Sequence, residues 1–120
     1  MNTARILVID QDMDRAERVA TLLEFMDYTP RIVAEVADLD LGRARPNDWM
    51  AVIVGDVEAS ALVTFTSWLS TQPLHPPVLE LPGHAPDAAW RAPLHRQTVW
   101  PLDFPVRRTQ LQDALSKAAV

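Results

Sequence analysis

The chain has 120 residues and no Cys, and its 16 acidic and 11 basic residues give a net charge of -5. This length fits one domain, and a hydrophobic content of 48% is enough for a packed core, which argues against disorder. The lack of Cys excludes a disulfide framework, a Cys-ligated metal centre and a thiol nucleophile. An acidic chain is a poor direct binder of nucleic acid. No apolar run is long enough to cross a membrane and no secretory signal opens the chain, so we expect a cytoplasmic domain without membrane contact.

The first half of the chain predicts two strands and two helices. Residues 6–9 form a continuous β-branched run, typical of a strand buried on both faces. The helix that follows has Asp12 as a predicted N-cap, and its apolar stripe consists of Ala16, Val19, Ala20, Leu23 and Met26. Residues 28–33 predict a second strand, and Pro30 indicates that it lies at a sheet edge. Residues 36–44 predict a short helix.

The second half repeats this alternation with weaker elements. A fully apolar strand over 50–54 is followed by a helix over 58–69, a strand over 77–81, a helix of at most two turns over 87–91 and a weak strand over 98–102. Thr109 is a predicted cap for the last helix. Eight of the ten Pro residues lie from Pro73 onward, so we expect shorter helices here than in the first half.

This alternation predicts one α/β domain over residues 1–120. The expected architecture is a flavodoxin-like three-layer sandwich, with a five-stranded parallel sheet of order 2-1-3-4-5 and helices on both faces. In such sheets ligands bind outside the carboxyl ends of the strands, at the switch point between strands 1 and 3. The residues expected at that point are Asp10, Gln11, Asp12, Gly55 and Asp56.

The run from Ile6 to Arg15, an apolar strand followed by acids and then a helix, resembles the receiver domain of bacterial response regulators. The resemblance implies a phosphorylation site. In receivers, two carboxylates after strand 1 help to hold Mg²⁺, and an Asp at the end of strand 3 accepts the phosphoryl group. A Ser or Thr after strand 4 and a Lys after strand 5 contact the phosphoryl oxygens.

The chain departs from this pattern at the acidic positions. Asp10 matches the first metal-binding acid and Asp12 a third, peripheral one, but Gln11 stands where the second acid is expected. The acceptor position falls on Gly55 or, with a slip of one residue, on Asp56, and both alternatives stay open. A simple capping or turn role for the acids is the alternative that needs no ligand.

The chain also departs from the pattern at the hydroxyl and Lys positions. The hydroxyl position falls on Pro82 or Gly83, and the Lys position falls on Phe104. The only Lys in the chain is Lys117, in the last helix, and Arg107 and Arg108 lie past the end of strand 5. We therefore predict a degenerate receiver pocket without a cation, with no metal, no cofactor and no catalytic residue.

Three short segments, residues 52–58, 81–83 and 102–105, resemble the N-terminal domain of the FleQ family of flagellar master regulators, which belong to the sigma-54-dependent activators. The resemblance implies a longer protein with an AAA+ ATPase domain and a C-terminal helix-turn-helix. It implies that this domain is a non-enzymatic regulatory and dimerisation module of a transcriptional activator of flagellar genes. The expected partners are a second copy of this domain, bound through an altered dimer surface, and an attached or partner AAA+ domain.

Two other functions remain open. The first is a working phosphoreceiver with Asp56 as acceptor and with Asp10 and Asp12 holding Mg²⁺. The second is a stand-alone adaptor that binds another protein through a surface with Trp68 and Trp90, which are expected to be partly exposed, since aromatic residues are enriched in interfaces. Trp49 and Trp100 are expected to pack partly in the core, and the three His residues have no metal-ligand spacing.

Overall fold

The computed structural model describes residues 4–41, 43, 49–72, 76–82, 90, 94 and 99–118. Its strands form one five-stranded sheet of order β2-β1-β3-β4-β5, in which each neighbouring pair is parallel. The strands are β1 (Arg5–Ile9), β2 (Thr29–Val33), β3 (Ala51–Val54), β4 (Val78–Glu80) and β5 (Val99–Pro101). The predicted fold class and strand order are confirmed, and β2, which contains Pro30, is an edge strand as expected.

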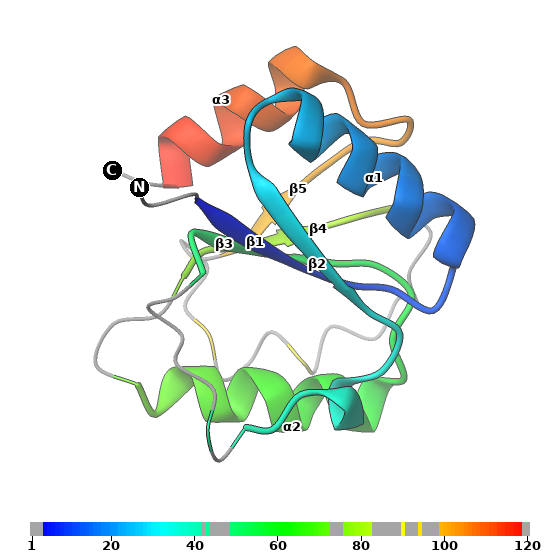
Figure 1. The fold of residues 1–120 in the computed structure, drawn as a ribbon. Coiled ribbons are helices and arrows are strands. Elements are labelled where there is room, and N and C mark those ends of the chain that lie inside the picture. Colours follow the sequence, from blue (N-terminus) through cyan, green and yellow to red (C-terminus); the bar gives the residue numbers. More distant parts are fainter. Residues whose placement is uncertain are drawn as a thin grey trace.

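Helices cover both faces of this sheet. Figure 1 shows α1 (Met13–Phe25) and α3 (Arg108–Ala118) on one face and α2 (Ala59–Ser70) on the other. The short 3-10 helix η1 (Val36–Asp38) packs on the α2 side. Among the described residues, none of the helices combines the length and the apolar character that crossing a membrane requires.

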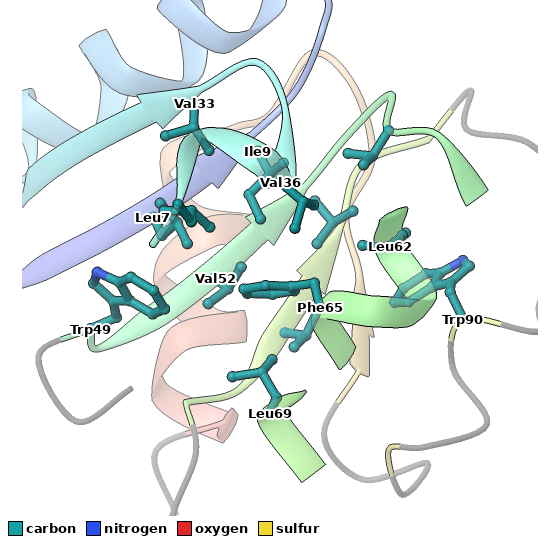
Figure 2. Packing of buried hydrophobic residues seen from close by; sticks show 14 of the residues in the cluster. Leu7, Ile9, Val33, Val36, Trp49, Val52, Leu62, Phe65, Leu69 and Trp90 are labelled. Carbon is teal, nitrogen blue, oxygen red and sulfur yellow. The ribbon is translucent and has the colours of Figure 1, made fainter. Parts of the chain in front are cut away.

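The continuous apolar runs arise because the central strands are buried on both faces. Leu7 and Ile9 of β1 contribute to the cluster beneath α2, whereas Ile6 and Val8 contribute to the cluster beneath α1 and α3. Side chains alternate between the two faces of a strand, so both faces of β1 must be apolar. Figure 2 shows how Phe65 and Leu69 of α2 reach Val52 of β3 in the first of these clusters.

Helix α1 begins as its sequence predicts. Asp12 is the N-cap, and its Oδ1 accepts a hydrogen bond of 3.2 Å from the backbone N–H of Arg15. Ala16, Val19 and Leu23, three members of the predicted stripe, are buried against the sheet. The cap and the stripe together fix where α1 starts and which way it faces.

The helix predicted over 36–44 is wrong in type and length. Among residues 36–41 and 43, the part of this range that the structure describes, the helical segment is the 3-10 helix η1, and Leu39, which follows it, adopts an extended backbone. An apolar pair with a spacing of three residues, here Val36 and Leu39, suits a 3-10 turn as well as an α-helix. The helix predicted over 87–91 lies outside the described residues except for Trp90.

The proposed exposure of Trp90 is also wrong, because its side chain is only 1% exposed and belongs to the core beneath α2. Trp68 is partly buried, and its ring meets that of Trp49 edge-on with centroids 6.4 Å apart. The backbone carbonyl of Trp90 accepts a hydrogen bond of 2.7 Å from the buried hydroxyl of Thr66 on α2. The chain after β4 is therefore anchored to α2 at this residue.

Replacing Thr66 by Val should lower the free energy of unfolding by about 1–2 kcal/mol, because the buried carbonyl of Trp90 loses its hydroxyl partner. Urea denaturation measures the change. The matched control is Thr64→Val, since Thr64 is exposed and its hydroxyl donates to the Ser60 carbonyl of its own helix. Equal effects of the two substitutions would show that the bond to Trp90 adds nothing to stability.

Candidate functional site

The candidate site lies at the carboxyl edge of the sheet, where β1 and β3 end side by side. Ile9 pairs with Val54 in the parallel ladder, and the backbone N–H of Gly55 donates to the Ile9 carbonyl at 2.8 Å. The next residues in register, Asp10 and Gly55, therefore lie level with each other. This is the sequence-predicted meeting point of the two strand ends, and the structure brings the two residues together there.

Asp10 is completely buried, and its carboxylate accepts four hydrogen bonds. Oδ1 accepts from the backbone N–H groups of Asp12 and Asp56, each at 2.9 Å, and from Nη2 of Arg15 at 3.1 Å. Oδ2 accepts from Nε of Arg15 at 2.7 Å. An ionised carboxylate offers about four lone-pair sites, so these donors use most of its capacity.

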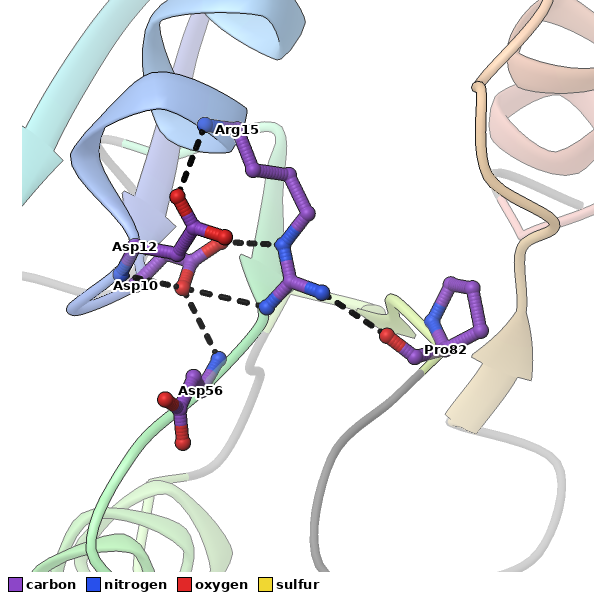
Figure 3. Close-up of polar contacts among 5 residues, drawn as sticks. All are labelled: Asp10, Asp12, Arg15, Asp56 and Pro82. Carbon is purple, nitrogen blue, oxygen red and sulfur yellow. Dashed lines mark hydrogen bonds and ion pairs between the residues drawn. The ribbon is translucent and has the colours of Figure 1, made fainter.

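Arg15 comes from the first turn of α1, and its side chain is 12% exposed. Figure 3 shows its guanidinium lying between Asp10 and Pro82, whose backbone carbonyl accepts from Nη1 at 2.8 Å. The hydrogen bond with Asp10 raises the pKa of Arg15 against the opposing effect of burial, and the negative charges of Asp10, Asp12 and Asp56 act in the same direction. The guanidinium is therefore a permanent cation in the cleft.

Gly55 leaves the space that the ion pair occupies. A Cβ atom at this position would overlap the carboxylate of Asp10 and would lie 2.8 Å from Nη2 of Arg15. Nothing larger than hydrogen fits at residue 55 while Asp10 and Arg15 remain where they are. The glycine is thus required by close approach of two charged side chains.

The prediction of a cleft without a cation is wrong. The positive charge comes from Arg15 on α1, and not from the end of strand 5, where the receiver pattern places it. The signal was available in the sequence, since helical side chains tilt toward the helix N-terminus and Arg15 lies one turn after Asp12. An Arg at that position points back toward the carboxyl end of β1, where Asp10 is.

The other predicted pocket residues contribute differently. Gln11 has an exposed side chain, and its backbone N–H donates to the Asp56 carbonyl at 2.9 Å. The side chain of Asp56 is exposed, and in Figure 3 its carboxylate points away from Asp10. Pro82 offers its carbonyl, and Phe104, 38% exposed, follows β5. In the part of the chain that the structure describes, no three His, Asp or Glu side chains gather as metal ligands.

Solved structures share this fold at low sequence identity. The signal receiver domain of an HD domain-containing protein from Pseudomonas fluorescens matches with a TM-score of 0.73 and 21% identity, over 99% of this chain and 88% of that one. The chemotaxis protein CheY4 from Vibrio cholerae matches with a TM-score of 0.72 and 19% identity, over 97% and 98% of the two chains. A putative pilus assembly protein from Burkholderia thailandensis has a TM-score of 0.69 and 20% identity, over 98% of each chain. These matches show a receiver fold.

A comparison with curated protein sequences found no significant match. The family comparison is more informative, because residues 5–120 match the family of the flagellar regulatory protein FleQ. That match includes every strand and helix described above, together with Asp10, Arg15 and Gly55. The chain is therefore a receiver-like regulatory domain that belongs to the FleQ family of flagellar regulatory proteins.

Proposed function

We propose that this domain regulates through protein contacts and does not accept a phosphoryl group. The observation that carries the proposal is the close approach of the Asp10–Arg15 ion pair to Gly55, which leaves no room for a side chain at residue 55. The receiver pattern puts the phosphoryl acceptor at the end of strand 3, and the pairing of Ile9 with Val54, one residue earlier in each strand, favours Gly55 over Asp56 for that position. Glycine has no nucleophile, and a side chain in its place would overlap the ion pair.

The rest of the cleft supports the same proposal. Phosphoryl transfer to a carboxylate needs cationic groups that are free to meet the incoming oxygens. Arg15 already donates to Asp10 and to Pro82, and Asp10 already accepts from four donors. By the sequence pattern, Gln11 stands where a second metal-binding acid is expected, Pro82 or Gly83 stands at the hydroxyl position, and Phe104 stands at the Lys position. Each missing contact is commonly worth about 3 kcal/mol in a transition state, so their combined loss is large.

We further propose that the domain is the N-terminal regulatory and dimerisation module of a sigma-54-dependent activator of flagellar genes. It would act in the cytoplasm, without catalysis of its own, on an attached or partner AAA+ domain. Membership of the FleQ family supports this role. The net charge of -5 supports assigning DNA binding to another part of the protein.

A working phosphoreceiver is the second candidate, favoured by one observation: the carboxylate of Asp56, one residue after Gly55, is exposed. Incubation with acetyl phosphate and Mg²⁺, followed by intact mass measurement, separates the two functions. We expect the mass to stay unchanged. A Mg²⁺-dependent phosphoryl adduct that disappears in Asp56→Asn would establish Asp56 as the acceptor and refute the proposal. The third candidate, an adaptor that uses Trp68 and Trp90, loses support because Trp90 is buried.

The dimerisation part of the proposal predicts a concentration-dependent dimer. Light scattering at tens of micromolar protein should give a mass above that of the 13.4 kDa monomer. Acetyl phosphate should leave this mass unchanged, because the proposed dimer does not depend on phosphorylation. A monomer throughout this concentration range would show that the isolated domain does not drive dimerisation.

A further inference from the structure

Arg15 joins two parts of the fold that the sheet itself keeps apart. Its guanidinium bonds to Asp10 at the end of β1 and to the carbonyl of Pro82, two residues after the end of β4. Strand β3 lies between β1 and β4 in the sheet, so the Arg15 side chain must cross the end of β3. It can do so because the residue there is Gly55, which has no side chain to block the path.

Different nitrogen atoms of the guanidinium make the contacts with Asp10 and with Pro82. Nε and Nη2 face the carboxylate of Asp10, and Nη1 faces the carbonyl of Pro82 (Figure 3). The planar, rigid fork of an Arg presents these donors in fixed directions, whereas a Lys ammonium is a single point of charge. A Lys at position 15 could neutralise Asp10, but it would have no second nitrogen for Pro82.

The chain after β4 has a second anchor of the same kind. Thr66 of α2 donates to the carbonyl of Trp90 at 2.7 Å, just as Arg15 of α1 donates to the carbonyl of Pro82 at 2.8 Å. Side chains from helices on opposite faces of the sheet therefore hold the backbone at both Pro82 and Trp90. Of these two contacts, the one with Pro82 involves the candidate site, because its donor, Arg15, also forms the ion pair with Asp10.

We propose that Arg15 is a positioning residue that links the carboxyl ends of β1 and β4, so that the backbone at Leu81 and Pro82 is held against the end of β1. This inference rests on the proposed function for its meaning, because the link would fix the backbone directly after β4, at Leu81 and Pro82, in a regulatory domain that does not accept a phosphoryl group. The link itself is a physical claim that can be tested separately. Its two parts, charge neutralisation of Asp10 and attachment of Pro82, are separable by substitution.

The test compares Arg15→Lys with the control Arg18→Lys, which alters an exposed Arg one turn along on the same helix. Carbonyl ¹³C NMR of Pro82 reports the hydrogen bond from Nη1. Hydrogen exchange reports the amide of Leu81, which donates to the Val54 carbonyl at 2.8 Å. In Arg15→Lys we expect a changed Pro82 carbonyl shift and about tenfold faster exchange at Leu81, with both values unchanged in Arg18→Lys. Wild-type values for both groups in Arg15→Lys would overturn the link and leave Arg15 a counter-ion only.

A double variant keeps the test decisive if Arg15→Lys folds poorly. Asp10→Asn with Arg15→Gln removes both charges together, so no buried charge is left without a partner. We expect the same changes at Pro82 and Leu81, and an unaltered Pro82 carbonyl would again refute the link. Acetyl phosphate treatment of the wild type distinguishes the two proposals: a phosphoryl adduct there refutes the proposed function, whereas the NMR result alone decides the link.

Discussion

Replacing Arg15 by Gln is expected to lower the free energy of unfolding by about 3 kcal/mol, because it leaves the buried carboxylate of Asp10 without its charged partner. Breaking a buried ion pair commonly costs about 3–5 kcal/mol, and the lower end applies because Arg15 retains some contact with solvent. The raised pKa of Arg15 means that its charge is fully present at neutral pH and below. Urea denaturation at neutral pH measures the loss.

Two variants show whether charge is the cause. Asp10→Asn combined with Arg15→Gln should recover more than half of the lost stability, since neither charge is then buried alone. Arg18→Gln, at an exposed position on α1, should change stability by no more than about 0.5 kcal/mol. If the double variant is as unstable as Arg15→Gln, packing of the Arg15 side chain and not the ion pair explains the effect.

Replacing Gly55 by Ala is expected to lower the free energy of unfolding by about 2–3 kcal/mol. The added methyl group would overlap the Asp10 carboxylate, which is held by backbone N–H groups as well as by Arg15 and cannot simply rotate away. Gly55→Asp should be worse, because it adds a second negative charge beside Asp10. Restoring an acid to this position should therefore not by itself restore phosphorylation, which acetyl phosphate and mass measurement check.

A double-mutant cycle tests the steric explanation. In the background of Asp10→Ala the two closest contacts of a methyl group at residue 55 are gone, and the remaining one is Nη2 of Arg15, at the end of a flexible side chain that Asp10 no longer holds. Most of the cost of Gly55→Ala should then disappear, as a coupling between the two positions. The same cost in both backgrounds would contradict a clash with Asp10 and would point to the backbone of Gly55 itself.

Most of the fold could be predicted because its strands carry strong local signals. The strands over 6–9 and 50–54 were recognisable as continuous apolar runs, and Asp12 with the following stripe located α1. The residues after Leu39 lack such a pattern. Val36 and Leu39 have a spacing that both an α-helix and a 3-10 turn satisfy, so the local pattern does not choose between them, and in the structure both side chains are buried in the cluster beneath α2.

The candidate site could be placed from the sequence but not completed. The strand ends located Asp10 and Gly55, because parallel strands end at the same edge. The ion-pair partner of Asp10 was not predicted, because the receiver pattern places the cation after strand 5, whereas Arg15 belongs to α1. Its contact with Pro82 spans 67 residues of sequence, and such a contact depends on the packed positions of α1 and β4. The burial of Trp90 has the same origin, since its contact with Thr66 is also distant in sequence.

The most direct test of the central claim is an NMR titration of the ¹⁵N-labelled domain with Mg²⁺ and beryllofluoride at millimolar concentrations. The account predicts that the amide signals of Gln11, Asp12, Gly55 and Asp56 stay in place, because Asp10 and Arg15 already satisfy each other in the cleft. A saturable, Mg²⁺-dependent shift of these signals that is lost in Asp56→Asn would contradict it. That result would show that the cleft still takes a metal ion and a phosphoryl mimic.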